Sequence, residues 1–397
     1  MFIFGGFTKK VKLRPSDVSI DNFLSKLHYR FTFALLLACT VLLSSKQFIK
    51  QHIQCIRDKG EKGGVVDDAI GTFCFISSTF TVNKYHNSSY RPGVHVAQSG
   101  VGPEQPGDEL TYHAYYQWVP FVLFGQALLF YLPHYLWKSL ENGRIKAIVS
   151  QVKTSIYTAE EDTVISGYKI DSHETRQNRE KLFNDIFITW ARMKMNRDWA
   201  RNFIMCEMLY IVNILLQIQL IDRFLQGNFL NLGMRWIRNE KEALESVFPK
   251  ITKCSFNKYG YAGSVQNLDI LCVLPLNIIN EKIYTLLWFW FLILLVFTTL
   301  GTVWRVLSFL LHNNGAFNRL VWAEVSPGPA LKAAEIEMIS NKLSFSDWFF
   351  IYYIGKNMDS RMFRRVVADL GLSLSLGKHL KPIIESEKSK LNSESYC

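Results

Sequence analysis

The stretch IYTLLWFWFLILLVFTTLGTVWRVLSFLL, residues 283–311, decides the fold class of this chain. Apolar residues fill it almost without interruption, and Arg305 carries its only charge. A helix needs about 20 such residues to cross the hydrocarbon core of a bilayer. We therefore predict a membrane-spanning helix over 283–311, longer than the bilayer requires, so that one end emerges into water as helix.

Three further apolar stretches are long enough to span a bilayer, at residues 28–46, 115–137 and 203–221. The first has a short apolar core, so residues at its two ends must add to its length. The second has aromatic residues at both ends, as is usual near a membrane–water interface, and contains Pro133. Charged residues fill the intervals between the four stretches. This pattern predicts a mainly α-helical, polytopic membrane protein.

The connections between these spans define the expected domains. Residues 1–27 precede the first span, and 47–114, 138–202 and 222–282 form the three loops. Residues 312–397 alternate amphipathic segments, at 330–343, 347–354 and 360–370, with polar turns, which predicts a small helical domain followed by a disordered tail. Within the second loop, Arg179–Arg201 is expected to be a helix that leads into the third span.

Four cysteines indicate the sidedness of these loops. Cys55 and Cys74 lie in the first loop, and Cys254 and Cys272 lie in the third, with nearly equal spacing within each pair. Alternate loops of a four-span protein share one face of the membrane. Such widely spaced cysteines favour disulfides over a zinc site, which needs close spacing, and disulfides indicate the oxidising exterior. Four cysteines allow three connectivities, and the sequence leaves pairing within or between the loops open.

The net charge of +11 does not form a nucleic-acid-binding patch. Basic residues lie beside the spans, among them Lys9, Lys10, Lys12 and Arg14 before the first span and Lys138, Arg144 and Lys146 in the second loop, as the positive-inside tendency predicts. The outer loops also carry basic residues such as Arg57, but the tendency is weaker in long loops. No cleavable signal peptide is expected. Both termini are therefore predicted to be cytoplasmic.

Motifs of catalysis are missing from the sequence. It has no Gly-rich phosphate loop, no H-E-x-x-H and no G-x-S-x-G, so we expect neither an enzyme nor a cofactor or metal site. The spans contain few charges, with Glu207 and Arg305 as the exceptions. This scarcity favours a passive pore or a structural protein over a transporter. Glu207 and Arg305 could pair, but a position near the cytoplasmic interface is the interpretation we favour.

Two polar features of the spans and loops have alternative explanations. One face of the first span carries Thr32, Thr40, Ser44 and Gln47, which either face water or pack against a neighbouring helix. Asn87 begins the sequence Asn-Ser-Ser in the first loop and is a candidate glycosylation site.

Several motifs resemble those of the innexins, the gap-junction family of invertebrates. The signature is Tyr115-Tyr116-Gln117-Trp118-Val119 at the start of the second span. Further similar motifs are 21–30 before the first span, 72–81 around Cys74, 248–254 and 272–277 in the third loop, 280–290 in the fourth span and 355–359 near the C-terminus. Tyr261, where many members have proline, and the apolar N-terminus depart from the family pattern.

The resemblance implies a four-helix, large-pore channel subunit in the plasma membrane. It implies a small disulfide-bonded α/β domain outside the cell and a helical domain inside. Eight subunits, alike or of two kinds, would surround the pore, and two such hemichannels would dock across a gap junction. The pore would be lined by Met1, Phe2, Ile3, Phe4, Thr32, Thr40, Ser44 and Gln47. A hemichannel that never docks and a non-conducting contact protein remain as alternatives, and an occupied Asn87 would favour the former.

Overall fold

The computed structural model describes residues 18–49, 53–56, 67–86, 98–150, 195–260, 262–325, 343–358, 360, 363, 364 and 367. The chain divides into two compact units. Unit 1 comprises residues 1–25, 134–208 and 300–397, and unit 2 comprises residues 26–133 and 209–299. Met1–Phe4, Asn87, Tyr261 and most of Arg179–Arg201 lie outside the described residues.

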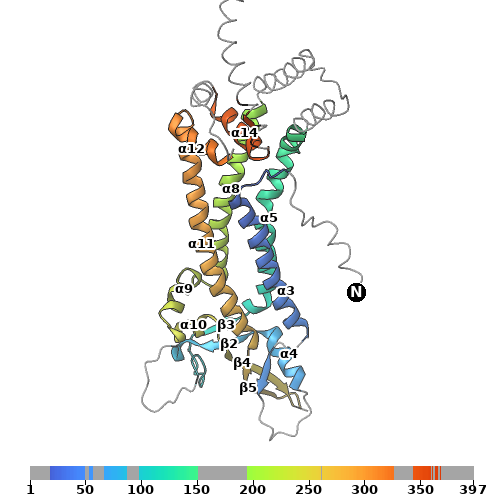
Figure 1. Ribbon diagram of the computed structural model, residues 1–397. Coiled ribbons are helices and arrows are strands. Elements are labelled where there is room, and N and C mark those ends of the chain that lie inside the picture. Colours follow the sequence, from blue (N-terminus) through green and yellow to red (C-terminus); the bar gives the residue numbers. More distant parts are fainter. Residues whose placement is uncertain are drawn as a thin grey trace, which may run out of the picture. The chain divides into compact units, whose positions relative to one another are not determined.

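Among the residues that the structure describes, four helical segments are long and apolar enough to cross a membrane, as the sequence predicts (Figure 1). The first consists of α2 (Phe23–Lys26), the π-helical turn η1 (Leu27–Thr32) and α3 (Phe33–Ile49). The others are α5 (Tyr115–Glu141), α8 (Met195–Phe224) and α11 (Pro275–Leu311). The first helical segment begins five residues before the expected span, which supplies the length that its apolar core lacks.

In unit 2, a five-stranded antiparallel sheet has the strand order β1-β5-β4-β2-β3. Its strands are β1 (Gln54–Ile56), β2 (Thr79–Val82), β3 (Leu110–His113), β4 (Ile251–Tyr259) and β5 (Val265–Val273). The first and third loops thus interleave in one sheet. Together with α4 (Asp67–Ser77) and η2 (Asn83–Tyr85), these strands form what we call the sheet domain.

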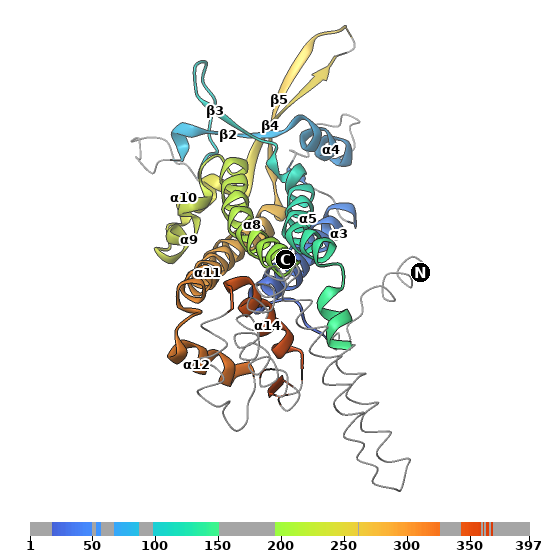
Figure 2. The ribbon, with the colours of Figure 1, turned by 90° about the horizontal axis from the view of Figure 1, so that it is seen from above.

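The β4–β5 hairpin extends beyond the rest of the sheet (Figure 2). Its strands pair along their whole length, whereas β1 pairs only with residues 271–273 of β5 and β2 pairs with β4 only at Phe80 and Lys253. The outer part of the hairpin is therefore a two-stranded ribbon, and Tyr259 and Val265 at its end are exposed.

The spans in unit 2 pack through large apolar side chains. Leu36 and Leu43 of α3, Phe130 of α5, and Phe291 and Leu294 of α11 are buried in one cluster. The same cluster includes residues of α9 (Phe229–Ile237) and α10 (Lys241–Val247), the two short helices between α8 and β4.

Unit 1 has an aromatic core. Trp137, Trp199, Phe203, Trp322 and Phe349 are all buried there. They come from α5, α8, α12 (Gly315–Val325) and α14 (Phe345–Lys356). Ser344 caps α14, because its side chain accepts a hydrogen bond from the Asp347 amide. The expected amphipathic segment 347–354 lies in α14, whereas 330–342 and most of 360–370 lie outside the described residues.

Candidate functional site

Two disulfides join the loops of the sheet domain to each other. Cys55 of β1 bonds Cys272 of β5, and Cys74 of α4 bonds Cys254 of β4. Of the three connectivities that the sequence leaves open, the structure therefore has one in which both bonds cross between the loops. The sulfurs of Cys55, Cys74 and Cys272 lie within 4.8 Å of one another, but all three belong to disulfides.

The Tyr-Tyr-Gln-Trp-Val motif connects α5 to this domain. The Gln117 side-chain amide donates a hydrogen bond to the Phe75 carbonyl near the end of α4. Tyr116 and Val119 are buried, whereas Trp118 is 61% exposed. One part of the motif therefore fixes the start of α5 against the sheet domain, and Trp118 lies on the outer surface of the helix.

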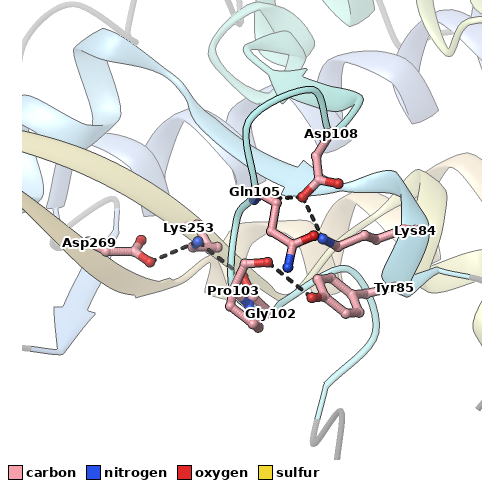
Figure 3. A network of polar contacts seen from close by, with 8 residues as sticks. All are labelled: Lys84, Tyr85, Gly102, Pro103, Gln105, Asp108, Lys253 and Asp269. Atoms are coloured by element: carbon pink, nitrogen blue, oxygen red, sulfur yellow. Dashed lines mark hydrogen bonds and ion pairs between the residues drawn. The ribbon is translucent and has the colours of Figure 1, made fainter. Parts of the chain in front are cut away.

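A loop of the sheet domain, residues 100–108, is held by side chains from other elements (Figure 3). Lys253 of β4 donates to the Gly102 carbonyl over 3.1 Å and pairs with Asp269 over 2.8 Å. The Tyr85 hydroxyl donates to the Pro103 carbonyl. Asp108 pairs with Lys84 and accepts a hydrogen bond from the Gln105 amide. These contacts give the loop a defined conformation although it has no strand or helix of its own.

Two histidines of the sheet domain share one hydroxyl group. Thr81 Oγ1 lies 2.8 Å from His113 Nε2 and 3.1 Å from His86 Nε2, and Ser99 Oγ lies 3.2 Å from His86 Nδ1. Burial lowers the pKa of both histidines, to about 4 for His113, where the nearby His86 lowers the pKa further. Gly100 accommodates the His86 ring at positive φ, where a Cβ would lie 2.5 Å from it. Sequence patterns gave no indication of this cluster.

We predict that acid loosens the sheet domain through these histidines. Burial lowers the pKa of His113 in the folded state below the usual 6.5. Neutral His113 therefore contributes fully to the free energy of unfolding above pH 6.5, and this contribution is lost as the pH falls toward 4. The loss is about 2 kcal/mol by pH 5. Amide exchange of β2 and β3, corrected for intrinsic rates, should accelerate between pH 7 and pH 5. His113→Gln should remove most of this acceleration, and an unchanged pH dependence in that variant would contradict the assignment.

The polar residues of the first span do not share one environment. Thr32 is completely buried, donates to the Leu27 carbonyl and accepts a hydrogen bond from Trp290 Nε1 over 2.9 Å. Thr32 therefore packs inside the subunit, and the expectation that it lines a pore is wrong for this conformation. Thr40 and Ser44 are partly exposed, and Thr40 donates to the Leu36 carbonyl. The side chain of Gln47 lies outside the described residues.

His28 of η1 is also buried, although its position suggests an interfacial residue. Its Nε2 lies 2.9 Å from Thr298 Oγ1, and its ring contacts Phe130 and Tyr210. Thr298 donates its own proton to the Leu294 carbonyl, so His28 Nε2 is the donor to Thr298. The π-helical turn thus directs two polar side chains, His28 and Thr32, toward α11.

Unit 1 anchors the residues that follow the N-terminal segment, and we call residues 18–25 the N-terminal anchor. The Ser19 amide donates to Asn357 Oδ1 over 2.6 Å, and Asn357 Nδ2 donates back to the Ser19 carbonyl. Asn357 belongs to the motif 355–359. Asn22 Nδ2 donates to Glu207 Oε1 over 2.6 Å. The C-terminal region and α8 therefore fix the position of the N-terminal anchor.

Glu207 and Arg305 form a two-point ion pair in unit 1. Arg305 Nε donates to Glu207 Oε2 over 2.7 Å, and its NH2 group donates to Oε1 over 2.8 Å. The guanidinium lies over the rings of Phe349, 4.2 Å from the centroid, and Phe203. The sequence allowed either an ion pair between these residues or a position near the cytoplasmic interface, and the second was favoured. The structure contains the ion pair.

The fold and these contacts define the class of the protein. It is a polytopic membrane protein with four spans, in which two of the loops are cross-bonded into one sheet domain, as in a large-pore channel subunit.

Comparison with known proteins identifies the family. The innexin family model matches residues 21–374. Innexin inx7 of Drosophila melanogaster is 43% identical over 92% of this chain and 84% of its own length. Innexin inx2 of Schistocerca americana is 39% identical over 95% of this chain and 99% of its own, and innexin inx2 of Drosophila melanogaster is 39% identical over 95% and 97%. The chain belongs to the innexin family, which forms gap-junction channels in invertebrates.

Proposed function

We propose that this chain is a subunit of a gap-junction channel that passes ions and small solutes between adjacent cells. The observation that carries the proposal is the cross-bonding of the first and third loops into one sheet domain, in a chain of the innexin family. A rigid domain of this kind suits a surface that must match a second hemichannel. Family membership also favours the expectation that the chain is not an enzyme.

The disulfides support an orientation with the sheet domain outside the cell and both termini in the cytoplasm. Disulfides persist in an oxidising compartment and are rare in the cytosol. Because the first and third loops share a domain, they lie on one face of the membrane, and the termini lie on the other. An epitope tag at the C-terminus should stain only after permeabilisation, whereas a tag in the hairpin turn near Gly260 should stain intact cells.

The pore is proposed to form within an octamer from the N-terminal segment and the first span. An apolar ring of Phe2, Ile3 and Phe4 at its narrowest point would regulate conduction by excluding water. The N-terminal anchor supports this proposal, because Asn357 and Glu207 hold the start of the first helical segment in place.

Recordings from paired cells test this function. Junctional current between two cells that each express only this chain supports docking. Current or dye uptake in single cells without any junctional current would instead support the hemichannel that releases small molecules, for which the sequon at Asn87 is the specific observation. The absence of both, with the protein at the cell surface, would contradict a channel made of this chain alone and would favour the non-conducting contact protein.

Cysteine accessibility should separate the polar residues of the first span. We expect a membrane-impermeant thiol reagent to reduce current through Thr40→Cys and Ser44→Cys channels, because these partly exposed positions remain candidates for the pore lining. Thr32→Cys should be unaffected, because Thr32 is buried against Trp290. The background should carry Cys39→Ser to remove the free thiol next to Thr40. Modification of Thr32→Cys without modification of Thr40→Cys would contradict this assignment.

A further inference from the structure

The short helix α9 has an apolar stripe that the described part of the chain leaves uncovered. Leu230, Met234 and Ile237 recur at i, i+4 and i+7, which places them on one side of the helix. They are 57%, 44% and 57% exposed. Phe229, Leu232 and Gly233 form the buried side. Asn231, Arg235 and Arg238 lie on a third side, next to the exposed stripe. The exposed surface of α9 therefore has an apolar side and a polar side, in addition to the side that is buried against the protein.

Close contacts hold α9 against the membrane-spanning helix α11 (Figure 1). Trp288 Nε1 donates to the Leu230 carbonyl over 3.0 Å, and the Trp236 ring packs edge-on against Phe289. The approach at Gly233 is tight, because a Cβ there would lie 2.0 Å from the Trp288 ring. The contact falls about two turns after Lys282, near the end of α11 that leads from the sheet domain.

Exposed apolar side chains also lie within about one helical turn of Trp288 or Phe289 along α11. Leu286, Leu292 and Ile293 are each exposed, and α11 is the most hydrophobic of the candidate spans. The stripe on α9 therefore continues an apolar surface that a bilayer would cover. Tryptophan and arginine beside such a stripe are typical of helices that lie in the membrane interface.

We propose that α9 lies in the lipid interface, with Leu230, Met234 and Ile237 in the outer part of the acyl region and Arg238 at the phospholipid phosphates. Arg235 donates a hydrogen bond to Asn228 over 3.1 Å, whereas Arg238 pairs with Glu240 only over 3.9 Å and its side chain is 68% exposed, so Arg238 is the cation that can reach a phosphate. Because α9 leads through α10 directly into β4, its depth in the bilayer would set the height of the sheet domain above the membrane. The position of α9 in the bilayer is independent of conduction and of docking.

Depth-dependent quenching in the full-length protein tests the proposal. Leu230→Cys and Ile237→Cys, in a background with Cys39, Cys206 and Cys397 changed to serine, are labelled with an environment-sensitive fluorophore in phosphatidylcholine nanodiscs. Asn231→Cys, on the polar side of α9, is the matched control, and Tyr259→Cys at the hairpin end is the control for full exposure to water.

If α9 lies in the lipid interface, the fluorophores attached at positions 230 and 237 should show blue-shifted emission. Nitroxide lipids labelled near the headgroup should quench these probes more than lipids labelled near the chain end, and aqueous iodide should quench both controls more strongly. Efficient iodide quenching at Leu230 and Ile237 would overturn the proposal. Protection from both iodide and nitroxide lipids would also overturn it and would assign the stripe to a neighbouring subunit.

Discussion

Cys55→Ser is expected to abolish junctional current between paired cells. The bond from Cys55 to Cys272 joins residues separated by 217 positions and fastens the edge strand β1 to β5. Strand β1 contains only three residues and has no other partner strand among the described residues. Loss of a disulfide from a small domain costs about 2–5 kcal/mol. The sheet domain should then lose the defined surface that docking requires.

The Cys55→Ser variant also tests which of the four loop cysteines are bonded to each other. In Cys55→Ser, the cysteine left without a partner should be Cys272, and alkylation followed by peptide mass spectrometry should label it. Labelling of Cys74 instead would mean that the bonds lie within the loops and would contradict the cross-bonded domain. The double variant Cys55→Ser/Cys272→Ser removes the unpaired thiol and should still lack current. Cys39→Ser is the matched control, since Cys39 is a free cysteine of the first helical segment, and it should keep normal coupling.

Glu207→Gln is expected to destabilise unit 1 by about 3–5 kcal/mol, the usual effect of removing one partner of a buried ion pair. Both side chains are almost buried, with exposed fractions of 14% and 12% for Glu207 and Arg305. The substitution leaves the Arg305 cation among aromatic rings and also replaces the acceptor of the Asn22 side chain by a weaker one. The fraction of protein that stays monodisperse after heating in detergent measures the effect.

A surface pair on the same helix provides the control. Asp198 and Arg201 form an ion pair on α8 with both side chains more than half exposed, so Asp198→Asn should change stability by at most about 1 kcal/mol. The double variant Glu207→Gln/Arg305→Met, which removes both charges, should be more stable than Glu207→Gln alone. Equal heat resistance of Glu207→Gln and Asp198→Asn would contradict a structural role for the buried pair.

The four spans and the disulfide-bonded cysteines could be predicted because both depend on local properties. A span is recognised from the length of an apolar stretch, which the thickness of the bilayer sets, and 283–311 meets that criterion without any knowledge of its neighbours. The helix of residues 347–354 follows in the same way from local pattern. The resemblance carried by Tyr115–Val119 placed the chain in its family before any fold was known.

The environment of the polar residues could not be predicted in this way. Thr32, Thr40 and Ser44 follow one stripe in the sequence, yet a π-helical turn directs Thr32 toward Trp290 and leaves the other two partly exposed. A helical wheel drawn with 3.6 residues per turn assumes a regular α-helix and does not account for the π-helical turn. The histidines at Thr81 are similarly brought together by the pairing of β2 with β3 and by the backbone hydrogen bonds that join Gly100 to Val82 and Tyr85.

The sequence by itself determined the membrane class, the number of spans and the family, because bilayer thickness and local hydropathy act on contiguous residues. The tertiary structure alone decided which cysteine pairs with which, that Glu207 meets Arg305, and that α9 has an apolar stripe beside α11 that the described residues leave uncovered. These are contacts between residues far apart in the chain, and only the packing of the helices and strands specifies which distant groups meet.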